Sequence, residues 1–163
     1  MTTPTHPAAT IARRGGRPAG ETTRSWLMHG TVVAWLGRGL LLKGASGIGK
    51  SDLALRLIEA GAQLVADDLV RLEVIDDRVI ARAAGGQGLI ELRGQGIFRL
   101  PARATVPLDL CVELCSLSAP PERLPDAASI ELGGLMLPAY RLDPLSASAT
   151  ARLRVLLTAE RMW

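Results

Sequence analysis

The sequence predicts an α/β domain of the strand-rich α+β kind, with two main helices, arranged around a phosphate-binding loop. The chain has 163 residues, which suits one domain with a single core. Its composition is 48% hydrophobic but only 3% aromatic, so the core must be built from aliphatic side chains. Short apolar runs that end in glycine, proline or acidic turns outnumber the helical patterns, which favours strands.

The phosphate-binding loop occupies residues 44–51, where Gly-Ala-Ser-Gly-Ile-Gly-Lys-Ser satisfies the pattern G-x-x-x-x-G-K-[ST]. A short apolar run precedes the loop, and a helical pattern follows it to Gly61, a natural helix stop. Lys50 supplies a charge for the β- and γ-phosphates, and the Ser51 hydroxyl can ligate Mg²⁺. The pattern predicts a nucleoside triphosphate site, or one for a close relative, formed by Gly44, Ala45, Ser46, Gly47, Ile48, Gly49, Lys50 and Ser51.

The rest of the chain alternates between predicted strands and turns, without internal repeats. Asp76 and Asp77 mark a hairpin turn, and residues 118–126 are a proline-rich connection. Residues 146–161 are predicted to be a helix, with the apolar side chains of Ala149, Leu153, Leu156 and Leu157 toward the core. The predicted strands are 26–28, 31–36, 40–43, 63–66, 69–75, 78–82, 89–92, 97–100, 105–114, 129–132 and 135–137.

The N-terminal residues 1–23 are predicted to be a disordered tail, and residues 24–163 the folded domain. The tail region is rich in Thr, Pro, Ala, Gly and Arg and lacks apolar periodicity; a flexible tail is favoured over a targeting peptide. The formal net charge of +3 comes from arginines near this end, so the domain itself is close to neutral. No basic stripe with interleaved aromatic residues occurs, and nucleic-acid binding is therefore not predicted.

The two cysteines, Cys111 and Cys115, have no metal-ligating residue at a useful spacing in the sequence. They are predicted to be buried free thiols, which fits a reducing compartment. No apolar run is long enough to cross a membrane, and the N-terminus lacks the apolar segment of a secretory signal. These features predict a protein of the cytoplasm that does not bind a membrane.

An acidic pair, Asp67 and Asp68, ends the strand predicted after the first helix. A carboxylate at that point lies beside a bound triphosphate, where it can hold Mg²⁺ or orient an attacking hydroxyl group. Adjacent residues of a strand alternate in direction, so at most one of the two is expected to face the γ-phosphate. The residues alone leave open which one does.

Two further features have both a structural and a functional interpretation. His29 precedes the loop by fifteen residues, and a lone histidine on a hairpin is more often structural. Glu91 and Arg93 lie two residues apart on one predicted strand face, next to Gly94 and Gly96. A surface salt bridge explains the charged pair, whereas a combined metal and phosphate site also explains the glycines.

Taken together, these motifs resemble the catalytic domain of bacterial HPr kinase/phosphorylase, the bifunctional serine kinase family of the phosphotransferase system. The resemblance covers His29-Gly30, the loop 44–51, the Leu-Val-Ala-Asp-Asp of residues 64–68 and the Glu-Leu-Arg-Gly-Gln-Gly-Ile of residues 91–97. Their order and the spacings from the histidine to the loop and from the lysine to the aspartates agree with the family. The family fold is similar to that of phosphoenolpyruvate carboxykinase, which agrees with the excess of strand.

The resemblance implies an ATP- and Mg²⁺-dependent kinase that phosphorylates a serine of the phosphocarrier protein HPr. It implies that Lys50 contacts the nucleotide phosphates, that Ser51 ligates the metal and that Glu91 is the second metal contact. HPr as the partner enters only through this resemblance.

The family pattern also implies roles for other side chains. Asp68 would be the base that takes the serine proton during phosphorylation and returns it during dephosphorylation, and Asp67 would support it. His29 would lie at the phosphate-transfer centre. Arg93 belongs to the family's signature stretch, and Arg123 resembles an arginine that the family places later in its active site.

Three departures from the family pattern limit what can be carried over. The resemblance implies a short form, without the family's N-terminal domain and with its C-terminal helices cut short at Trp163, so a homo-oligomer such as the family's hexamer stays an open alternative. Gln95 replaces the more usual apolar residue between two glycines. No Arg-Pro-Gly loop of the kind associated with dephosphorylation is recognisable around residues 140–144. The kinase interpretation is therefore stronger than the phosphorylase one.

Two rival functions remain at this stage. A small-molecule P-loop kinase usually carries a helical lid rich in arginine, and the sequence has no such insertion. A non-catalytic ATP-binding sensor would need the loop but no proton acceptor at Asp68. A GTPase is less favoured than either, because the guanine-reading sequence Asn-Lys-x-Asp does not occur.

Overall fold

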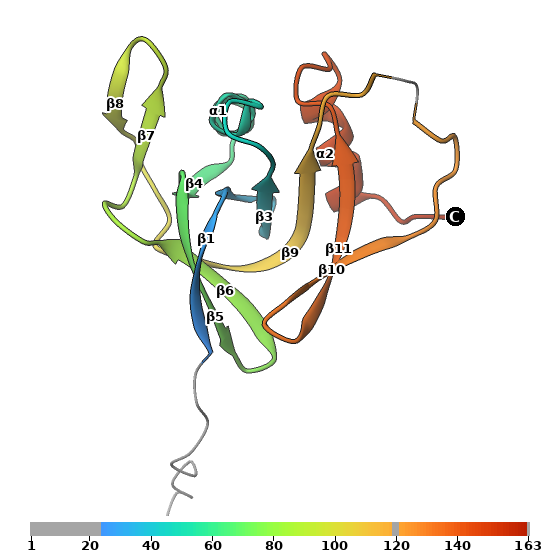
Figure 1. Cartoon of the computed structure of the whole chain (residues 1–163), viewed down its shortest axis with the longest axis horizontal. Helices are drawn as coiled ribbons and strands as arrows, with labels where there is room; N and C mark the ends of the chain where they lie inside the picture. The colour runs from blue at the N-terminus through green and yellow to red at the C-terminus, as the bar shows by residue number, and fades with distance from the viewer. Residues whose placement is uncertain (1–23, 119–120, 163) are drawn as a thin grey trace, which may run out of the picture.

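The computed structural model describes residues 24–118 and 121–162. The predicted disordered tail, residues 1–23, lies outside the described residues. Within the described part, strands dominate and two helices are present, as the sequence predicts. Figure 1 shows the helices together at one end of the molecule and a set of strand turns at the other.

The main sheet has the strand order β4-β2-β3-β9-β11-β10. β3 and β9 are parallel, β9 and β11 are parallel, and β2 runs antiparallel to both β3 and β4. The carboxyl ends of β4, β3, β9 and β11 therefore lie at the same edge, the top of Figure 1. The strand bounds are β2 Thr31–Trp35, β3 Arg38–Lys43, β4 Gln63–Ala66, β9 Thr105–Leu114, β10 Ala128–Leu132 and β11 Leu135–Leu142.

A second layer of antiparallel strands joins this sheet through β9. It consists of β1 (Ser25–His29), β5 (Leu69–Ile75) and β6 (Arg78–Ala83), paired in that order. The first residues of β9 pair with β6, and its later residues pair with β3 and β11. β9 is thus a member of both layers. β7 (Leu89–Leu92) and β8 (Gly96–Arg99) form a separate hairpin.

The first helix, α1, extends from Lys50 to Glu59 and begins directly at the phosphate-binding loop. It ends as the sequence predicts: Gly61 adopts a φ of 103°, and its N–H and that of Ala62 bond to the carbonyls of Ile58 and Leu57. This pair of bonds is the Schellman arrangement, in which glycine takes the left-handed position at little steric cost.

The C-terminal third differs from the prediction in two boundaries. β11 continues to Leu142, beyond the predicted end at residue 137, because its second half gains a parallel partner in β9. α2 covers only Ala149–Thr158 of the predicted 146–161. Residues 146–148 instead form turns, in which the Ser146 carbonyl accepts a bond from the Ala149 N–H. Ala149, Leu153 and Leu157 are buried, as the helical pattern predicts.

Two cores lie on opposite faces of the main sheet, because successive side chains of a strand point to opposite faces. On β3, Leu40 and Leu42 pack toward the helices, and Leu41 packs toward the β1–β5–β6 layer. On β9, Val112 joins the helix-side core and Cys111 the other. The strand beneath the phosphate-binding loop is therefore fully buried on both faces, which gives the loop a rigid support.

The cysteines are only partly as predicted. Both are free; Cys111 is buried, whereas Cys115 is half-buried at the end of β9. Burial raises the pKa of the Cys111 thiol to about 11, so this side chain is a packing residue rather than a nucleophile.

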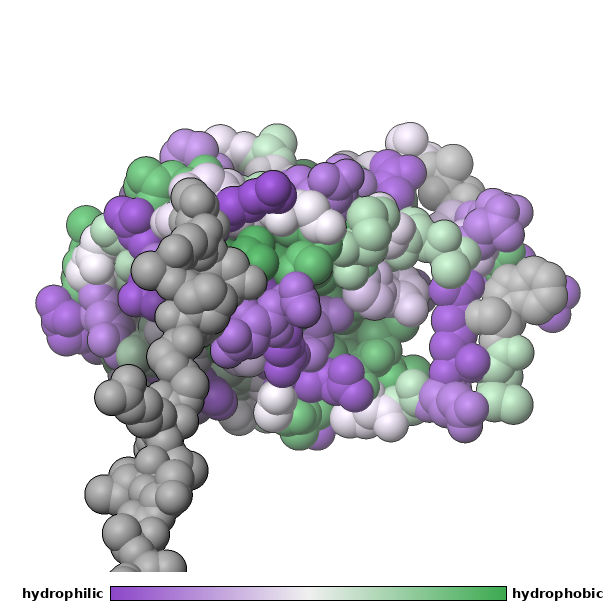
Figure 2. Space-filling model, turned by 90° about the horizontal axis from the view of Figure 1, so that it is seen from below, coloured by the Kyte–Doolittle hydropathy of each residue, from purple (hydrophilic) through white to green (hydrophobic). Residues whose placement is uncertain are grey.

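The surface at the strand-turn end is mixed in character. Figure 2 shows hydrophilic side chains interspersed with smaller hydrophobic areas on this face. Among the described residues, no helix is long and apolar enough to cross a membrane.

Gly39 is predicted to be the most sensitive glycine of the sheet. A Cβ at this position would overlap the carbonyl oxygen of Pro107 on the neighbouring β9. Gly39→Ala should therefore lower the free energy of unfolding by about 1–3 kcal/mol, the usual cost of overpacking. Denaturant unfolding of this variant beside Gly85→Ala gives the comparison, since a Cβ at Gly85 meets nothing within 4 Å. Equal stability of the two variants would contradict the close packing of β3 on β9.

Candidate functional site

The phosphate-binding loop connects β3 to α1 at the shared carboxyl edge of the strands. Positive φ values at Gly44, Gly47 and Gly49 allow its backbone to curl, a conformation that other residues rarely adopt. Lys50 folds back over the loop, and its ammonium group donates to the carbonyls of Gly44 (2.9 Å) and Ala45 (3.0 Å). The first turn of α1 points its N–H groups at the space that the loop encloses, which favours an anion there.

Asp67 is the centre of the polar contacts beneath the loop. It follows β4, and its carboxylate accepts bonds from the hydroxyl of Ser51 (2.8 Å) and from the hydroxyl of Thr31 (2.8 Å). The backbone N–H of Glu91 approaches the second carboxylate oxygen at 3.4 Å. These contacts bring α1, β2, β4 and the β7–β8 hairpin to one point. They fix the Asp67 carboxylate beside the hydroxyl that the sequence assigns to a metal.

Asp68 points elsewhere. Its φ of 64° is the left-handed conformation, so the chain turns sharply after β4 and sends the two neighbouring carboxylates in different directions. The Asp68 side chain is 87% exposed, and one of its oxygens lies 3.7 Å from Nδ1 of His29. The carbonyl of Asp68 also accepts a bond from the Gly30 N–H (3.0 Å), which holds the end of β1 against the end of β4.

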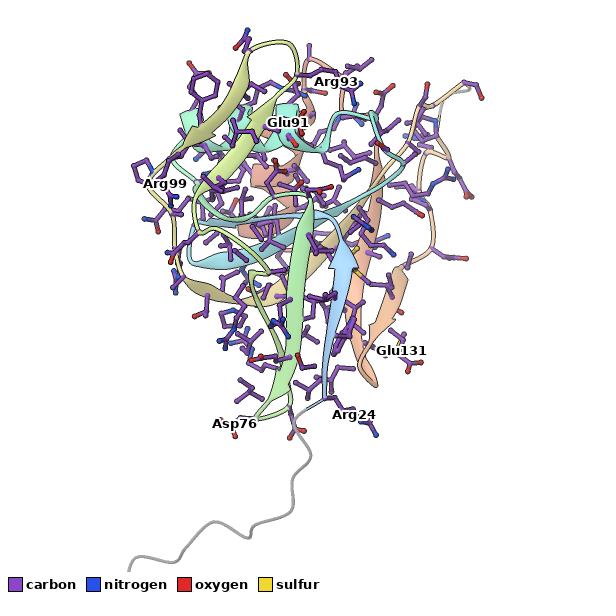
Figure 3. The ribbon with its side chains drawn as sticks, turned by 60° about the vertical axis from the view of Figure 1, so that its left-hand side comes forward. Arg24, Asp76, Glu91, Arg93, Arg99 and Glu131 are labelled. Atoms are coloured by element: carbon purple, nitrogen blue, oxygen red, sulfur yellow. The ribbon has the colours of Figure 1, made fainter. Side chains whose placement is uncertain are left out.

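The β7–β8 hairpin supplies the opposite wall. Figure 3 shows Glu91 and Arg93 on the hairpin at the helix end of the molecule, far from Arg24 and Asp76 at the strand-turn end. The Arg93 guanidinium reaches across to the loop. A Cβ added to Gly47 would lie 3.5 Å from the nearest nitrogen of this guanidinium. Arg99 secures the base of the hairpin by donating to the Gln87 carbonyl at 2.7 Å.

A pocket of about 460 Å³ opens between α1, the loop and the hairpin. Residues from four separate parts of the chain meet there. They include the residues that the sequence analysis predicts to contact phosphate, metal and the transferred proton. The lining residues are Thr31, Ser46, Gly47, Gly49, Lys50, Ser51, Asp52, Leu55, Asp67, Asp68, Glu91, Leu92, Arg93 and Gln95.

The structure does not gather all of the candidate residues. His29 is not among the residues that line the pocket, but it contacts Asp68, which is. Arg123 lies outside the pocket, on the exposed connection between β9 and β10. Sequence reasoning also missed Thr31, whose side chain is fully buried and bonds to Asp67. A lone polar residue at the start of an apolar strand was the signal that could have found it.

Comparison with known proteins places this chain in a family. Residues 21–118, more than half of the chain, match the family described as HPr Serine kinase C-terminal domain. The chain belongs to this family. The matched residues include the loop, both aspartates and the β7–β8 hairpin, and they end just after β9.

Relatives in this HPr kinase family agree with the match. The chain is 43% identical over 76 residues to the HPr kinase/phosphorylase of Clostridium acetobutylicum, and 46% identical over 78 residues to that of Clostridium novyi. Each alignment covers 46% of this chain and 25% of the relative, so the chain matches about a quarter of the length of these proteins.

A solved structure shows the same fold. The HPr(Ser) kinase/phosphatase from Coxiella burnetii superposes with a TM-score of 0.70 at 24% sequence identity. The alignment covers 84% of this chain and 99% of that chain. The strand-rich architecture with two helices is therefore that of an HPr kinase structure.

Proposed function

We propose that this chain is an ATP- and Mg²⁺-dependent protein kinase that phosphorylates a serine of the phosphocarrier HPr in the cytoplasm. The observation that carries the proposal is the Ser51–Asp67 contact of 2.8 Å beneath the phosphate-binding loop, with Asp68 a residue away on the wall of the same pocket. This arrangement supports a phosphate site, a metal site and a proton acceptor side by side, in a chain of the HPr serine kinase family.

The phosphate contacts come from the loop and from two cations. Lys50 bonds to two loop carbonyls, and phosphate oxygens would replace these acceptors when a nucleotide binds. Arg93 lies across the pocket, above Gly47. Both cations line the same pocket, where they would stabilise the negative charge on the equatorial oxygens of a transferring phosphoryl group.

The residues present fit a magnesium ion. Mg²⁺ prefers oxygen ligands, and proteins usually hold it with one or two carboxylates while substrate phosphates complete the coordination. Ser51 and Glu91, which line the same pocket, would be its ligands, with the Asp67 carboxylate orienting the Ser51 hydroxyl. In residues 24–118 and 121–162 no three His, Cys, Asp or Glu side chains gather as a metal site, so phosphate oxygens would have to contribute. When bound, the ion would neutralise charge on the β- and γ-phosphates.

The proton acceptor is assigned to Asp68. The Asp67 carboxylate already accepts bonds from two hydroxyl groups and is therefore poorly placed to take a further proton. Asp68 lines the same pocket with an exposed carboxylate, and His29 adjoins it at 3.7 Å. A serine hydroxyl entering from solvent would meet Asp68 first, and His29 would orient that carboxylate.

The decisive experiment is incubation of the chain with labelled ATP, Mg²⁺ and HPr. We expect the label on a serine of HPr, and no label on an HPr variant whose acceptor serine is replaced by alanine. Binding of ATP with no transfer to HPr would favour the ATP-binding sensor. Label that passes to a small molecule but not to HPr would favour a small-molecule kinase.

A further inference from the structure

The positions of the residues proposed for phosphoryl transfer indicate the direction in which a bound nucleotide extends from the phosphate-binding loop. In an in-line phosphoryl transfer the attacking and leaving oxygens lie on opposite sides of the γ-phosphate. Asp68 follows β4, and the β7–β8 hairpin, which completes the pocket, contacts Asp67 from the same side. The acceptor therefore enters from the β4 side. With Asp68 as the proposed base, the nucleoside would extend the other way, toward the carboxyl ends of β9 and β11, which lie beyond β3.

One described segment on that side contacts the loop directly. The turn after β11 places the ring of Pro144 at 3.6 Å from the position of a Cβ on Gly49. The guanidinium of Arg56, on α1, donates to the carbonyl of Pro144. Figure 1 shows this turn at the top of the molecule, beside the start of α1.

The same turn holds an apolar side chain in water. Leu145 is 82% exposed, although its N–H bonds to the Asp143 carboxylate at 2.9 Å and the next N–H, that of Ser146, bonds to the Asp143 carbonyl. These bonds and the Arg56 contact fix the backbone, so Leu145 is an exposed apolar group on a well-held turn. A single exposed leucine is ordinary; this one directly follows Pro144, whose ring lies close to Gly49 of the phosphate-binding loop.

We propose that Pro144 and Leu145 form the surface on which the purine ring of ATP lies. A flat, largely apolar base gains from covering an apolar side chain, and a turn that is already fixed loses little conformational entropy when it does so. The proposal rests on the proposed function, since it assumes that a nucleoside triphosphate occupies the loop. It adds that recognition of the base comes from the β11–α2 turn.

The test compares two ligands that share the phosphates and differ in the nucleoside: Mg-ATP and Mg-tripolyphosphate. Leu145→Asp should weaken ATP binding about tenfold, as expected for losing part of a buried leucine contact, and should leave tripolyphosphate binding unchanged. Leu145→Met should retain ATP affinity. Val155→Asp, an equally polar change at an exposed site of α2, should alter neither ligand. Isothermal titration calorimetry measures all eight affinities.

The other outcomes are distinct. Equal losses for both ligands in Leu145→Asp would show that the turn only supports the loop, and the proposal would be wrong. Unchanged ATP affinity in that variant would also overturn it while leaving the kinase function intact. A wild-type chain that binds neither ligand would refute the proposed function, and this inference with it.

Discussion

Asp68→Asn should bind ATP as the wild-type chain does and transfer the phosphoryl group to HPr about 10²–10⁴-fold more slowly, the usual contribution of a general base. The substitution keeps the size of the side chain and removes its negative charge. The Asp68 side chain is 87% exposed, and the carbonyl that anchors Gly30 belongs to the backbone, so the fold should not change. Nucleotide affinity and phosphorylation rate measured on the same preparation check the prediction.

Asp67→Asn is the matched comparison for that experiment. The two aspartates are neighbours, but Asp67 bonds to Ser51 and Thr31 inside the site. We expect the Asp67 variant to lose Mg²⁺-dependent nucleotide affinity as well as rate. If the Asp68 variant kept its rate and lost affinity, Asp68 would be a metal or structural residue, and Asp67 would become the candidate for the base.

Lys50→Ala should reduce phosphoryl transfer by at least about 10²-fold, the usual effect of removing one preorganised electrostatic contact from a transition state. Among the described residues, the ammonium group bonds to the Gly44 and Ala45 carbonyls of its own loop, so its loss should leave the core intact. Circular dichroism and the unfolding midpoint establish that the variant is folded, and the HPr phosphorylation assay measures the rate.

Lys43→Ala is the control for that loss of charge. Lys43 ends β3 immediately before the loop, and it does not line the pocket. This variant should retain the wild-type rate. Full turnover in a folded Lys50→Ala variant would show that the loop does not bind the reacting phosphates, and the kinase proposal would be wrong.

The local parts of this fold could be predicted from the sequence. The loop and its flanks, the Asp76-Asp77 hairpin and the end of α1 at Gly61 depend on residues close together in the chain, where pattern and turn chemistry decide. Both aspartates of the hairpin turn have the positive φ that such a turn requires.

The long-range parts could not be predicted from it. β1 is separated from β2 by Gly30 alone, yet it pairs with β5; Gly30 bonds to Asp68 at the point where the chain changes layers. The extension of β11 depends on a parallel partner 28 positions away in register, Ala139 against Cys111. The hydrophobic periodicity of one strand carries no information about which distant strand pairs with it.

The sequence predicted which residues form the site better than it predicted how those residues are arranged. Lys50, Ser51, Asp67, Asp68, Glu91 and Arg93 line one pocket, while Arg123 lies outside it. The division of the two aspartates, one toward Ser51 and one toward His29, follows from the left-handed backbone at Asp68. A strand pattern implies alternating directions, but it does not show where the strand stops or how the chain turns after it. Their chemical roles stay predictions until the variants are measured.

Because β9 belongs to both layers, its position in the sequence also affects how the chain folds during synthesis. β3, which supports the phosphate-binding loop, has β2 as its neighbour on one side from an early stage, but its other edge is covered only by β9. Until residues 105–114 emerge, an apolar strand presents an unpaired edge and neither core can close. Such an edge is a template for pairing with another nascent chain. The interval between the synthesis of β3 and that of β9 is therefore one period in which this protein is exposed to aggregation.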